Sequence, residues 1–104
     1  MFGLNKIKVI NVNDIDKLLG KIELIDIREK DEYSRGSIKT AKNIPMRELL
    51  DEPEKYLNKD KEYYILCQSG MRSNRTCSAL EKEGYKVINV AGGVGSYVGS
   101  QRNK

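Results

Sequence analysis

The chain has 104 residues, of which 33% are charged and 38% hydrophobic, and its formal net charge is +4. This length suits a single domain, 1–104, with its own core, and no apolar run approaches the ~20 residues of a membrane-spanning helix. The chain contains no histidine, which excludes catalysis and metal binding by that residue, and its scattered basic residues argue against nucleic-acid binding.

The start of the chain and its cysteines predict location and redox state. Residues 1–6 lack the apolar run of a signal peptide, so we expect a cytoplasmic protein. Cys67 and Cys77 are then expected to be reduced thiols. Their spacing is not that of metal ligands, so we expect no metal site, and we expect no cofactor either.

The first half of the chain predicts short strands and helices in alternation. A β-branched run predicts a strand at 7–10, and Asn13 is the expected N-cap of a helix that ends at Gly20. We also expect a helical turn at 29–35, a short strand at 43–44 and a helix at 46–50 that begins after Pro45.

The apolar run 22–28 predicts another strand, one that is covered on both faces as in a parallel sheet. Asp26 and Arg28 lie near its C-terminal end and on one face, because side chains alternate along a strand. They are either a surface pair or helix-cap partners, and their place at the end of a strand equally suits a role in bracing a neighbouring loop.

The second half of the chain centres on a strand at 62–66 that leads directly into Cys67. A helix follows, and one of its faces carries Ser73, Thr76, Cys77 and Leu80. A last strand is expected at 86–90. The alternation predicts an α/β fold with a largely parallel five-stranded sheet and helices on both sides. In such sheets ligands bind beyond the carboxyl ends of strands, which is where Cys67 lies.

The loop after this strand predicts an activated thiol. A free cysteine has a pKa near ~8.5, and a helix N-terminus lowers it. The expected donors to the Cys67 sulfur are the backbone N–H groups from Gln68 to Ser73, the hydroxyls of Ser69 and Ser73, and the helix dipole. Gly70 permits a positive φ that curls the loop into an anion-binding nest. Arg72 either adds positive charge or braces the loop.

The second cysteine has a different environment. Cys77 lies on the expected buried face of the helix, beside Thr76 and Leu80. We interpret it as a core residue in preference to a resolving thiol.

Several motifs follow one another along the chain, each modest alone and specific together. They are Asp26-Ile27-Arg28 with Glu32-Tyr33, Gly36-Ser37-Ile38 with Asn43-Ile44-Pro45, Cys67-x-x-Gly70-x-Arg72-Ser73, and Gly84-Tyr85 with Gly92-Gly93. In this order they resemble the single-domain form of the rhodanese family of sulfurtransferases over nearly the whole chain. The resemblance implies a rhodanese-like three-layer α/β/α fold.

The resemblance also implies a thiosulfate sulfurtransferase-like reaction. The thiolate of Cys67 attacks the outer sulfur of a donor such as thiosulfate and becomes a persulfide. The sulfur then passes to cyanide, a thiol or a protein partner of the thioredoxin-like or sulfur-relay kind. The loop that would cradle the anion comprises Gln68, Ser69, Gly70, Met71, Arg72 and Ser73, with Asp26 and Arg28 as support.

The chain departs from the family's pattern at several positions. Ser37 stands where the family often has His, Thr40 where Gly is common, and Tyr97 where a Trp usually follows the Gly-Gly pair. Gln68 and Met71 leave the loop with little charge beyond Arg72. A loop poor in cations favours a donor other than thiosulfate.

Two alternatives stay open. The first is a sulfur-relay or docking module that carries sulfur without turning over small molecules. The second is a phosphatase or arsenate reductase on the same fold, whose phosphate loops place five residues between Cys and Arg. Here four residues lie between Cys67 and Arg72, and the shorter ring suits a sulfur atom better than a phosphate.

Overall fold

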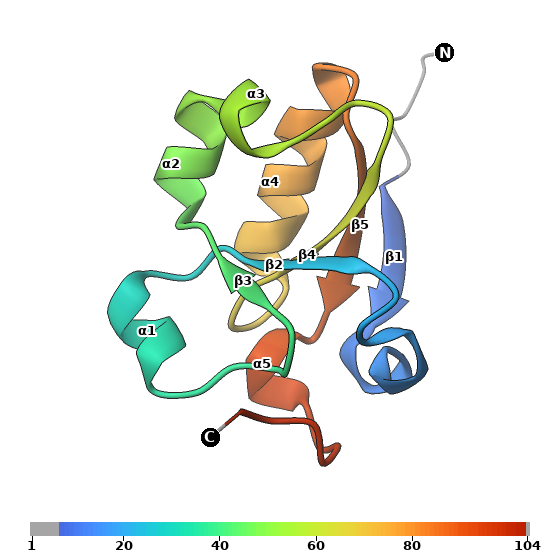
Figure 1. Ribbon diagram of the computed structural model, residues 1–104, viewed down its shortest axis with the longest axis vertical. Helices are drawn as coiled ribbons and strands as arrows, with labels where there is room; N and C mark the ends of the chain where they lie inside the picture. The colour runs from blue at the N-terminus through green and yellow to red at the C-terminus, as the bar shows by residue number, and fades with distance from the viewer. Residues whose placement is uncertain (1–6, 104) are drawn as a thin grey trace.

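A computed structural model of the chain describes residues 7–103; residues 1–6, on which the expected location depends, and residue 104 lie outside the described residues. The described part contains one five-stranded sheet, in which every neighbouring pair is parallel and the strand order is β1-β5-β4-β2-β3 (Figure 1). The strands are β1 (Lys8–Asn11), β2 (Glu23–Asp26), β3 (Lys42–Asn43), β4 (Glu62–Leu66) and β5 (Lys86–Ala91). The predicted α/β fold with a parallel sheet is therefore confirmed.

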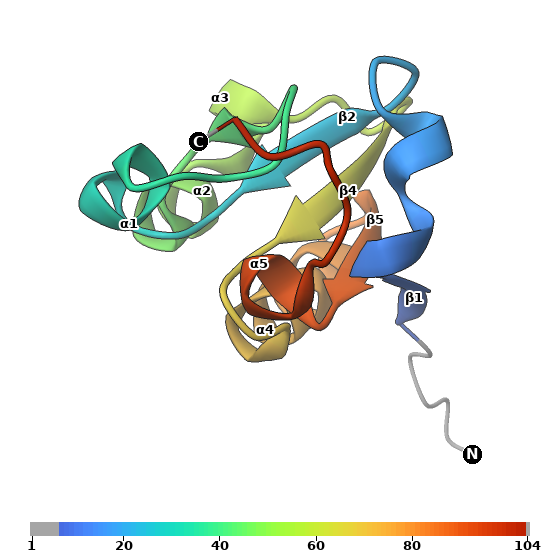
Figure 2. The same cartoon turned by 90° about the horizontal axis from the view of Figure 1, so that it is seen from below.

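Two hydrophobic clusters lie on opposite faces of the sheet. One is covered by α2 (Met46–Asp51), α3 (Pro53–Tyr56) and α4 (Met71–Lys82). The other is covered by two 3₁₀ turns, η1 (Val12–Asp14) and η2 (Asp16–Leu18), together with α1 (Lys30–Ser34) and α5 (Gly93–Ser96). Figure 2 looks onto the edge where the strands end, with α5 beside the segment that joins β4 to α4.

The central strand β4 contributes to both clusters because its side chains alternate. Tyr63, Ile65 and Cys67 lie in the cluster under α2 and α4, while Leu66 lies in the cluster under α5. Such burial on both faces is typical of a parallel strand between neighbours. It places Cys67 at the end of the central strand of the sheet.

The prediction of an α-helix after β1 is wrong, because the chain forms the 3₁₀ turns η1 and η2 there. Val12 and Ile15 are both buried, and a spacing of three residues brings side chains into line in a 3₁₀ helix. The N-cap is Asn11, whose side-chain oxygen accepts a hydrogen bond from the Asn13 amide at 2.9 Å. Asn13 instead uses its own side chain to bond the Ser96 carbonyl and the Val98 amide.

The second predicted strand is shorter than expected, since β2 ends at Asp26 and Arg28 lies beyond it. The carboxylate of Asp26 accepts a hydrogen bond from the Arg28 backbone amide at 3.0 Å. This amide therefore bonds a side chain in place of a neighbouring strand. The third strand is displaced by one residue from 43–44 to Lys42–Asn43. Pro45 precedes α2 as expected.

The order of the strands creates a topological switch point at their carboxyl ends. The chain leaves β2 towards β3 on one side and leaves β4 towards β5 on the other. The connections after these adjacent strands therefore diverge, which is the place where open α/β sheets bind ligands. Within residues 7–103, none of the helices is both long and apolar enough to cross a membrane.

Candidate active site

Cys67 directly follows β4, and its side chain is 0% exposed. The loop after it turns at Gly70, which has a φ of 97°. A Cβ at Gly70 would also lie 3.0 Å from the Gly92 amide nitrogen. Backbone conformation and close packing therefore both require glycine at this position.

Two backbone amides donate hydrogen bonds to the Cys67 sulfur. The Gly70 nitrogen lies 3.0 Å from Sγ and the Ser73 nitrogen 3.3 Å, the latter in the first turn of α4. The expected hydroxyl donor Ser69 behaves differently, because its Oγ accepts a hydrogen bond from the Met71 amide at 3.4 Å. Short hydroxyl side chains often bond their own turn in this way.

The pKa of Cys67 reflects a competition between burial and these donors. Burial raises the pKa of the thiol, while hydrogen bonds from the Ser73 side chain and from the amides of Ser73 and Gly70 lower it, with the smallest contribution from the Ser69 amide. The donors prevail, and the pKa of Cys67 lies below its ordinary value. The loop therefore favours the thiolate without any histidine.

Asn89 of β5 is a site residue that the sequence did not single out. Its Oδ1 accepts a hydrogen bond from the Ser73 hydroxyl, and its Nδ2 donates to the Gly70 carbonyl at 3.4 Å. The protonated Cys67 sulfur donates in turn to the Ser73 hydroxyl oxygen at 3.3 Å. Asn89 thus holds the Ser73 proton while Cys67 is a thiol, and that proton can turn to the sulfur when Cys67 ionises.

Arg72 braces the loop against α1. Its two terminal nitrogens each lie 2.9 Å from one oxygen of Glu32, which is a bidentate ion pair. The hydrogen bond from Arg72 lowers the pKa of Glu32 to about 2, against a smaller opposing effect of burial. Arg72 therefore makes a contact that braces the loop, which is one of the two roles predicted for it.

Asp26 and Arg28 form a buried pair beneath the same loop. The Arg28 guanidinium contacts both Asp26 carboxylate oxygens at 3.0–3.1 Å and donates to the Gly36 carbonyl at 2.7 Å. Its remaining terminal nitrogen donates to the Gln68 side chain at 3.1 Å. The pair is not on the surface, and Arg28 contacts the loop through Gln68.

Three residues depart from the family's pattern, and two of them make specific side-chain contacts. Ser37 is buried and donates its hydroxyl proton to Asp26 at 2.6 Å. Thr40 has a φ of 74°, a left-handed conformation that favours glycine. The Tyr97 hydroxyl donates to Asp16 at 2.7 Å.

The start of α5 fixes the loop backbone from the other side. The amides of Val94 and Gly95 donate to the carbonyls of Cys67 and Gln68, each at 2.9 Å. A side chain at Gly93 would place its Cβ 2.4 Å from the Cys67 carbonyl oxygen. This close approach explains the need for glycine after β5.

Cys77 lies in the middle of α4 and is also 0% exposed. Burial raises the pKa of its thiol to about 12, and the nearby negative charges of Glu81 and Cys67 act in the same direction. The position agrees with the expected core role. The thiol stays protonated in ordinary solution.

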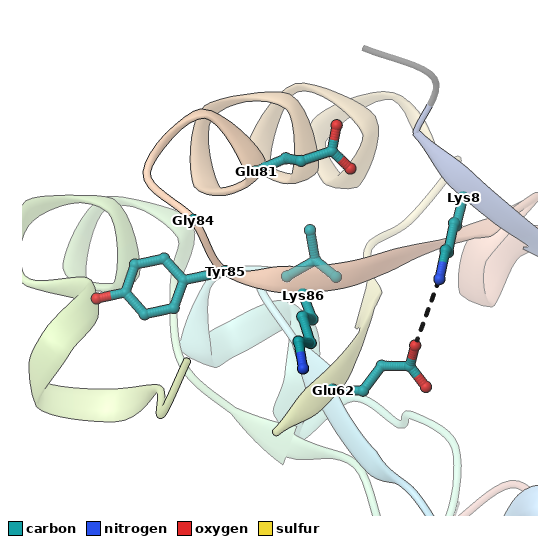
Figure 3. Close-up of a pocket in the computed structure, with 7 residues that line it drawn as sticks. Lys8, Glu62, Glu81, Gly84, Tyr85 and Lys86 are labelled. Atoms are coloured by element: carbon teal, nitrogen blue, oxygen red, sulfur yellow. Dashed lines mark ion pairs between the residues drawn. The ribbon is translucent and has the colours of Figure 1, made fainter. Parts of the chain in front are cut away.

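A separate hollow lies at the opposite edge of the sheet, where β1, β4 and β5 begin (Figure 3). Its lining residues are Lys8, Glu62, Glu81, Gly84, Tyr85, Lys86 and Val87, none of which belongs to the predicted site. Lys8 and Glu62 form a long ion pair there at 4.0 Å. Across residues 7–103, no group of three or more His, Cys, Asp or Glu side chains is placed to hold a metal ion.

Comparison with known proteins adds family relationships to this geometry. A family model described as a rhodanese-like domain matches residues 11–100. The chain is 40% identical over 84 residues to a putative sulfurtransferase of Bacillus subtilis, YtwF, and the match covers 81% of each protein. It is 35% identical over 79 residues to a putative sulfur carrier protein of the same bacterium, YrkF, covering 75% of this chain and 42% of the relative. The crystal structure of a rhodanese-like domain protein from Staphylococcus aureus matches with a TM-score of 0.82 and 29% identity, covering 93% of this chain and 97% of that one.

Proposed function

The chain belongs to the rhodanese-like domain family, and on that premise we propose that Cys67 is a nucleophile that accepts a sulfane sulfur, holds it as a persulfide and passes it on. Relatives named sulfurtransferases support sulfur transfer in general. The proposed acceptors are cyanide in an assay and a thiol or a thioredoxin-like or sulfur-relay protein in the cell. The proposed unit is one domain, 1–104. Both cysteines are free thiols, which agrees with a cytoplasmic location.

One observation carries this proposal: two amides and a hydroxyl surround a sulfur whose pKa is lowered. A thiolate is the nucleophilic form of cysteine. The same neutral donors suit the persulfide anion that follows, because each product of the first step is again a sulfur anion. Gln68 to Ser73 are the proposed anion-binding loop, and Asp26 and Arg28 are its proposed support.

The proposed reaction balances without an external oxidant. With thiosulfate, the Cys67 thiolate attacks the outer sulfur, the S–S bond breaks, and its electron pair leaves with sulfite: Cys67–S⁻ + S–SO₃²⁻ gives Cys67–S–S⁻ + SO₃²⁻. With cyanide, Cys67–S–S⁻ + CN⁻ gives Cys67–S⁻ + SCN⁻. Each step forms one bond to sulfur and breaks one.

Access to the sulfur requires movement of the loop. Cys67 is 0% exposed, whereas Gln68, Ser69 and Met71 around it are exposed. A donor therefore reaches Sγ only when these residues shift aside. Met71, 65% exposed, can move without loss of core packing.

The test is a turnover assay coupled to mass spectrometry. Purified protein is incubated with thiosulfate, a thiosulfonate or polysulfide, and thiocyanate is measured after addition of cyanide. We expect a mass increase of about 32 Da, one sulfur atom, on Cys67 before cyanide is added. If no sulfane donor produces the increase, the proposal is wrong.

A sulfur-carrier role is the second candidate, favoured by the similarity to a putative sulfur carrier protein. This role uses the same persulfide but needs a protein acceptor. A persulfide that forms readily, yet turns over negligibly with cyanide and small thiols, would favour the carrier.

A phosphatase or arsenate reductase is the weaker candidate. Four residues separate Cys67 from Arg72, and the Arg72 guanidinium is engaged by Glu32. The ion pair leaves this cation less available for a phosphate. Activity on p-nitrophenyl phosphate that exceeds thiosulfate–cyanide turnover would decide for this alternative.

A further inference from the structure

We propose that the Glu32–Arg72 ion pair sets the class of sulfur donor: the site takes singly charged sulfane donors, such as organic persulfides and thiosulfonates, in preference to doubly charged thiosulfate. This inference rests on the proposed function of Cys67. It concerns which donor reaches the sulfur, and the transfer itself is unchanged.

The charge of Arg72 is compensated by Glu32. The Arg72 guanidinium and the Glu32 carboxylate meet through two contacts of 2.9 Å, with side chains 33% and 22% exposed. Glu32 is held further by the Glu29 backbone amide, which donates to its Oε1 at 3.0 Å. The carboxylate is therefore fixed in place, and it offsets the charge of the only arginine in the Cys67 to Ser73 loop.

The charge of Arg28, the other arginine that contacts the loop, is compensated by Asp26. Its side chain is 5% exposed and pairs with Asp26, which is 0% exposed. Its remaining donors go to the Gly36 carbonyl and to Gln68. Both arginines around Cys67 therefore come with a carboxylate of their own.

The sulfur itself is held by groups without net charge. Its partners are the amides of Gly70 and Ser73 and the hydroxyl of Ser73. With the two ion pairs counted as neutral, the ionised site carries the single negative charge of Cys67. Thiosulfate brings two more negative charges to a partly dehydrated site, where like charges repel strongly.

A singly charged donor meets less repulsion in the same chemistry. For a thiosulfonate, Cys67–S⁻ + CH₃SO₂–S⁻ gives Cys67–S–S⁻ + CH₃SO₂⁻, and the electron pair of the broken S–S bond leaves with the sulfinate. For an organic persulfide anion, Cys67–S⁻ + RS–S⁻ gives Cys67–S–S⁻ + RS⁻. Methanethiosulfonate differs from thiosulfate by a methyl group in place of one charged oxygen, so the two form a matched pair of probes.

The test compares rates of persulfide formation on Cys67 from methanethiosulfonate and from thiosulfate. The readout is the ratio of the two second-order rate constants, because any change in the thiolate population cancels in it. The informative variant is Glu32→Gln, which keeps the oxygen that accepts the Glu29 amide and removes the charge. Glu32→Asp keeps the charge, and Asp31→Asn removes a carboxylate of α1 that pairs with Arg35 instead.

In the unmodified protein we expect the thiosulfonate to react at least about tenfold faster. Glu32→Gln should reduce this ratio about tenfold by leaving the charge of Arg72 uncompensated, whereas Glu32→Asp and Asp31→Asn should keep it within about threefold. A ratio that stays within about threefold in Glu32→Gln overturns the inference, whatever happens to the absolute rates.

The exposed Arg75, one turn further along α4, provides an independent test. We expect Arg75→Gln to change thiosulfate loading by less than about threefold. A loss of about tenfold would mean that a free cation serves the site, which overturns the inference even if a Glu32 variant fails to fold. Failure of the proposed function looks different, since neither donor would then load the unmodified protein.

Discussion

Cys67 and Cys77 share one hydrophobic cluster and are both 0% exposed, yet their thiols have opposite acid–base properties. The pKa of Cys67 lies below its ordinary value, and the pKa of Cys77 rises to about 12. Equal burial therefore does not decide reactivity. The difference comes from the hydrogen-bond donors around each sulfur.

The place of each cysteine on its element explains this difference. Cys77 lies in the second turn of α4, where backbone N–H groups donate to carbonyls four residues earlier. Cys67 faces the first turn of the same helix, where N–H groups lack such partners, and Gly70 and Ser73 donate theirs to its sulfur. A strand end opposite a helix start can activate a thiol, and a helix interior cannot.

The largest expected effect separates the two cysteines directly. Cys67→Ser should lower the rate of persulfide formation at least about a thousandfold, because the nucleophile is lost. Cys77→Ser should leave that rate within about threefold, although the buried hydroxyl costs about 1–3 kcal/mol of stability. Rates are followed by intact mass, and stability by urea unfolding. A persulfide that survives in Cys67→Ser would contradict the assignment.

Substitution of Gly70 should make Cys67 resemble Cys77, because it removes a hydrogen-bond donor to the Cys67 sulfur. Gly70→Ala forces alanine to adopt a φ of 97° and places its Cβ against the Gly92 amide. This strain should displace the residue 70 N–H from the sulfur, and alkylation of Cys67 at about pH 7 should slow by more than about tenfold. Gly20 has a similar φ of 85° with nothing within 4 Å of an added Cβ, so Gly20→Ala is the matched control.

Gly20→Ala should cost about 1–2 kcal/mol from the left-handed conformation alone and leave alkylation unchanged. Urea unfolding measures the strain in both variants, and iodoacetamide kinetics measure the thiolate. Equal alkylation rates in the two variants would show that the Gly70 amide does not stabilise the Cys67 thiolate.

Asn89 offers a smaller change in the same direction. Asn89→Asp places a negative charge beside Ser73 and holds its hydroxyl proton away from the sulfur, so the pKa of Cys67 should rise and alkylation at about pH 7 should slow about tenfold. Asn74→Asp adds an exposed charge in α4 and should change the rate by less than about threefold. If both variants behave alike, the Ser73–Asn89 contact has no part in holding the thiolate.

The smallest expected effect concerns the brace between α1 and the loop. The folded-state pKa of Glu32 is lowered to about 2 from an ordinary 4.5. The stabilising contribution is therefore present above pH 4.5 and is lost as the pH falls towards 2. The difference in unfolding free energy between the unmodified protein and Glu32→Gln should shrink over this interval. A difference that grows on acidification would contradict this origin.

Local features of the sequence were enough to predict the strand that delivers Cys67 and the turn at Gly70. An apolar run that ends on cysteine, followed by glycine and a helix face, is a local pattern, and the structure has each part. The parallel sheet also followed from the alternation of elements. The η1 and η2 turns did not, because the choice between an α-helix and 3₁₀ turns depends on what Val12 and Ile15 pack against.

The partners that complete the site were beyond local patterns. Asn89 reaches Ser73 only because β5 pairs with β4 in a register that sets Ile65 beside Asn89. Glu32 reaches Arg72 across 40 residues of chain. A polar residue within the apolar strand β5 was the one available signal for Asn89, since buried amides need partners.

The most direct test of the central claim is a titration of each thiol by itself. Thiolate absorbance is followed against pH in Cys77→Ser, which reports Cys67, and in Cys67→Ser, which reports Cys77. We predict that the pKa of Cys67 lies below the ordinary value of a cysteine thiol, and that Cys77 stays protonated until about pH 12. Two thiols that ionise together, or Cys77 before Cys67, would contradict the account.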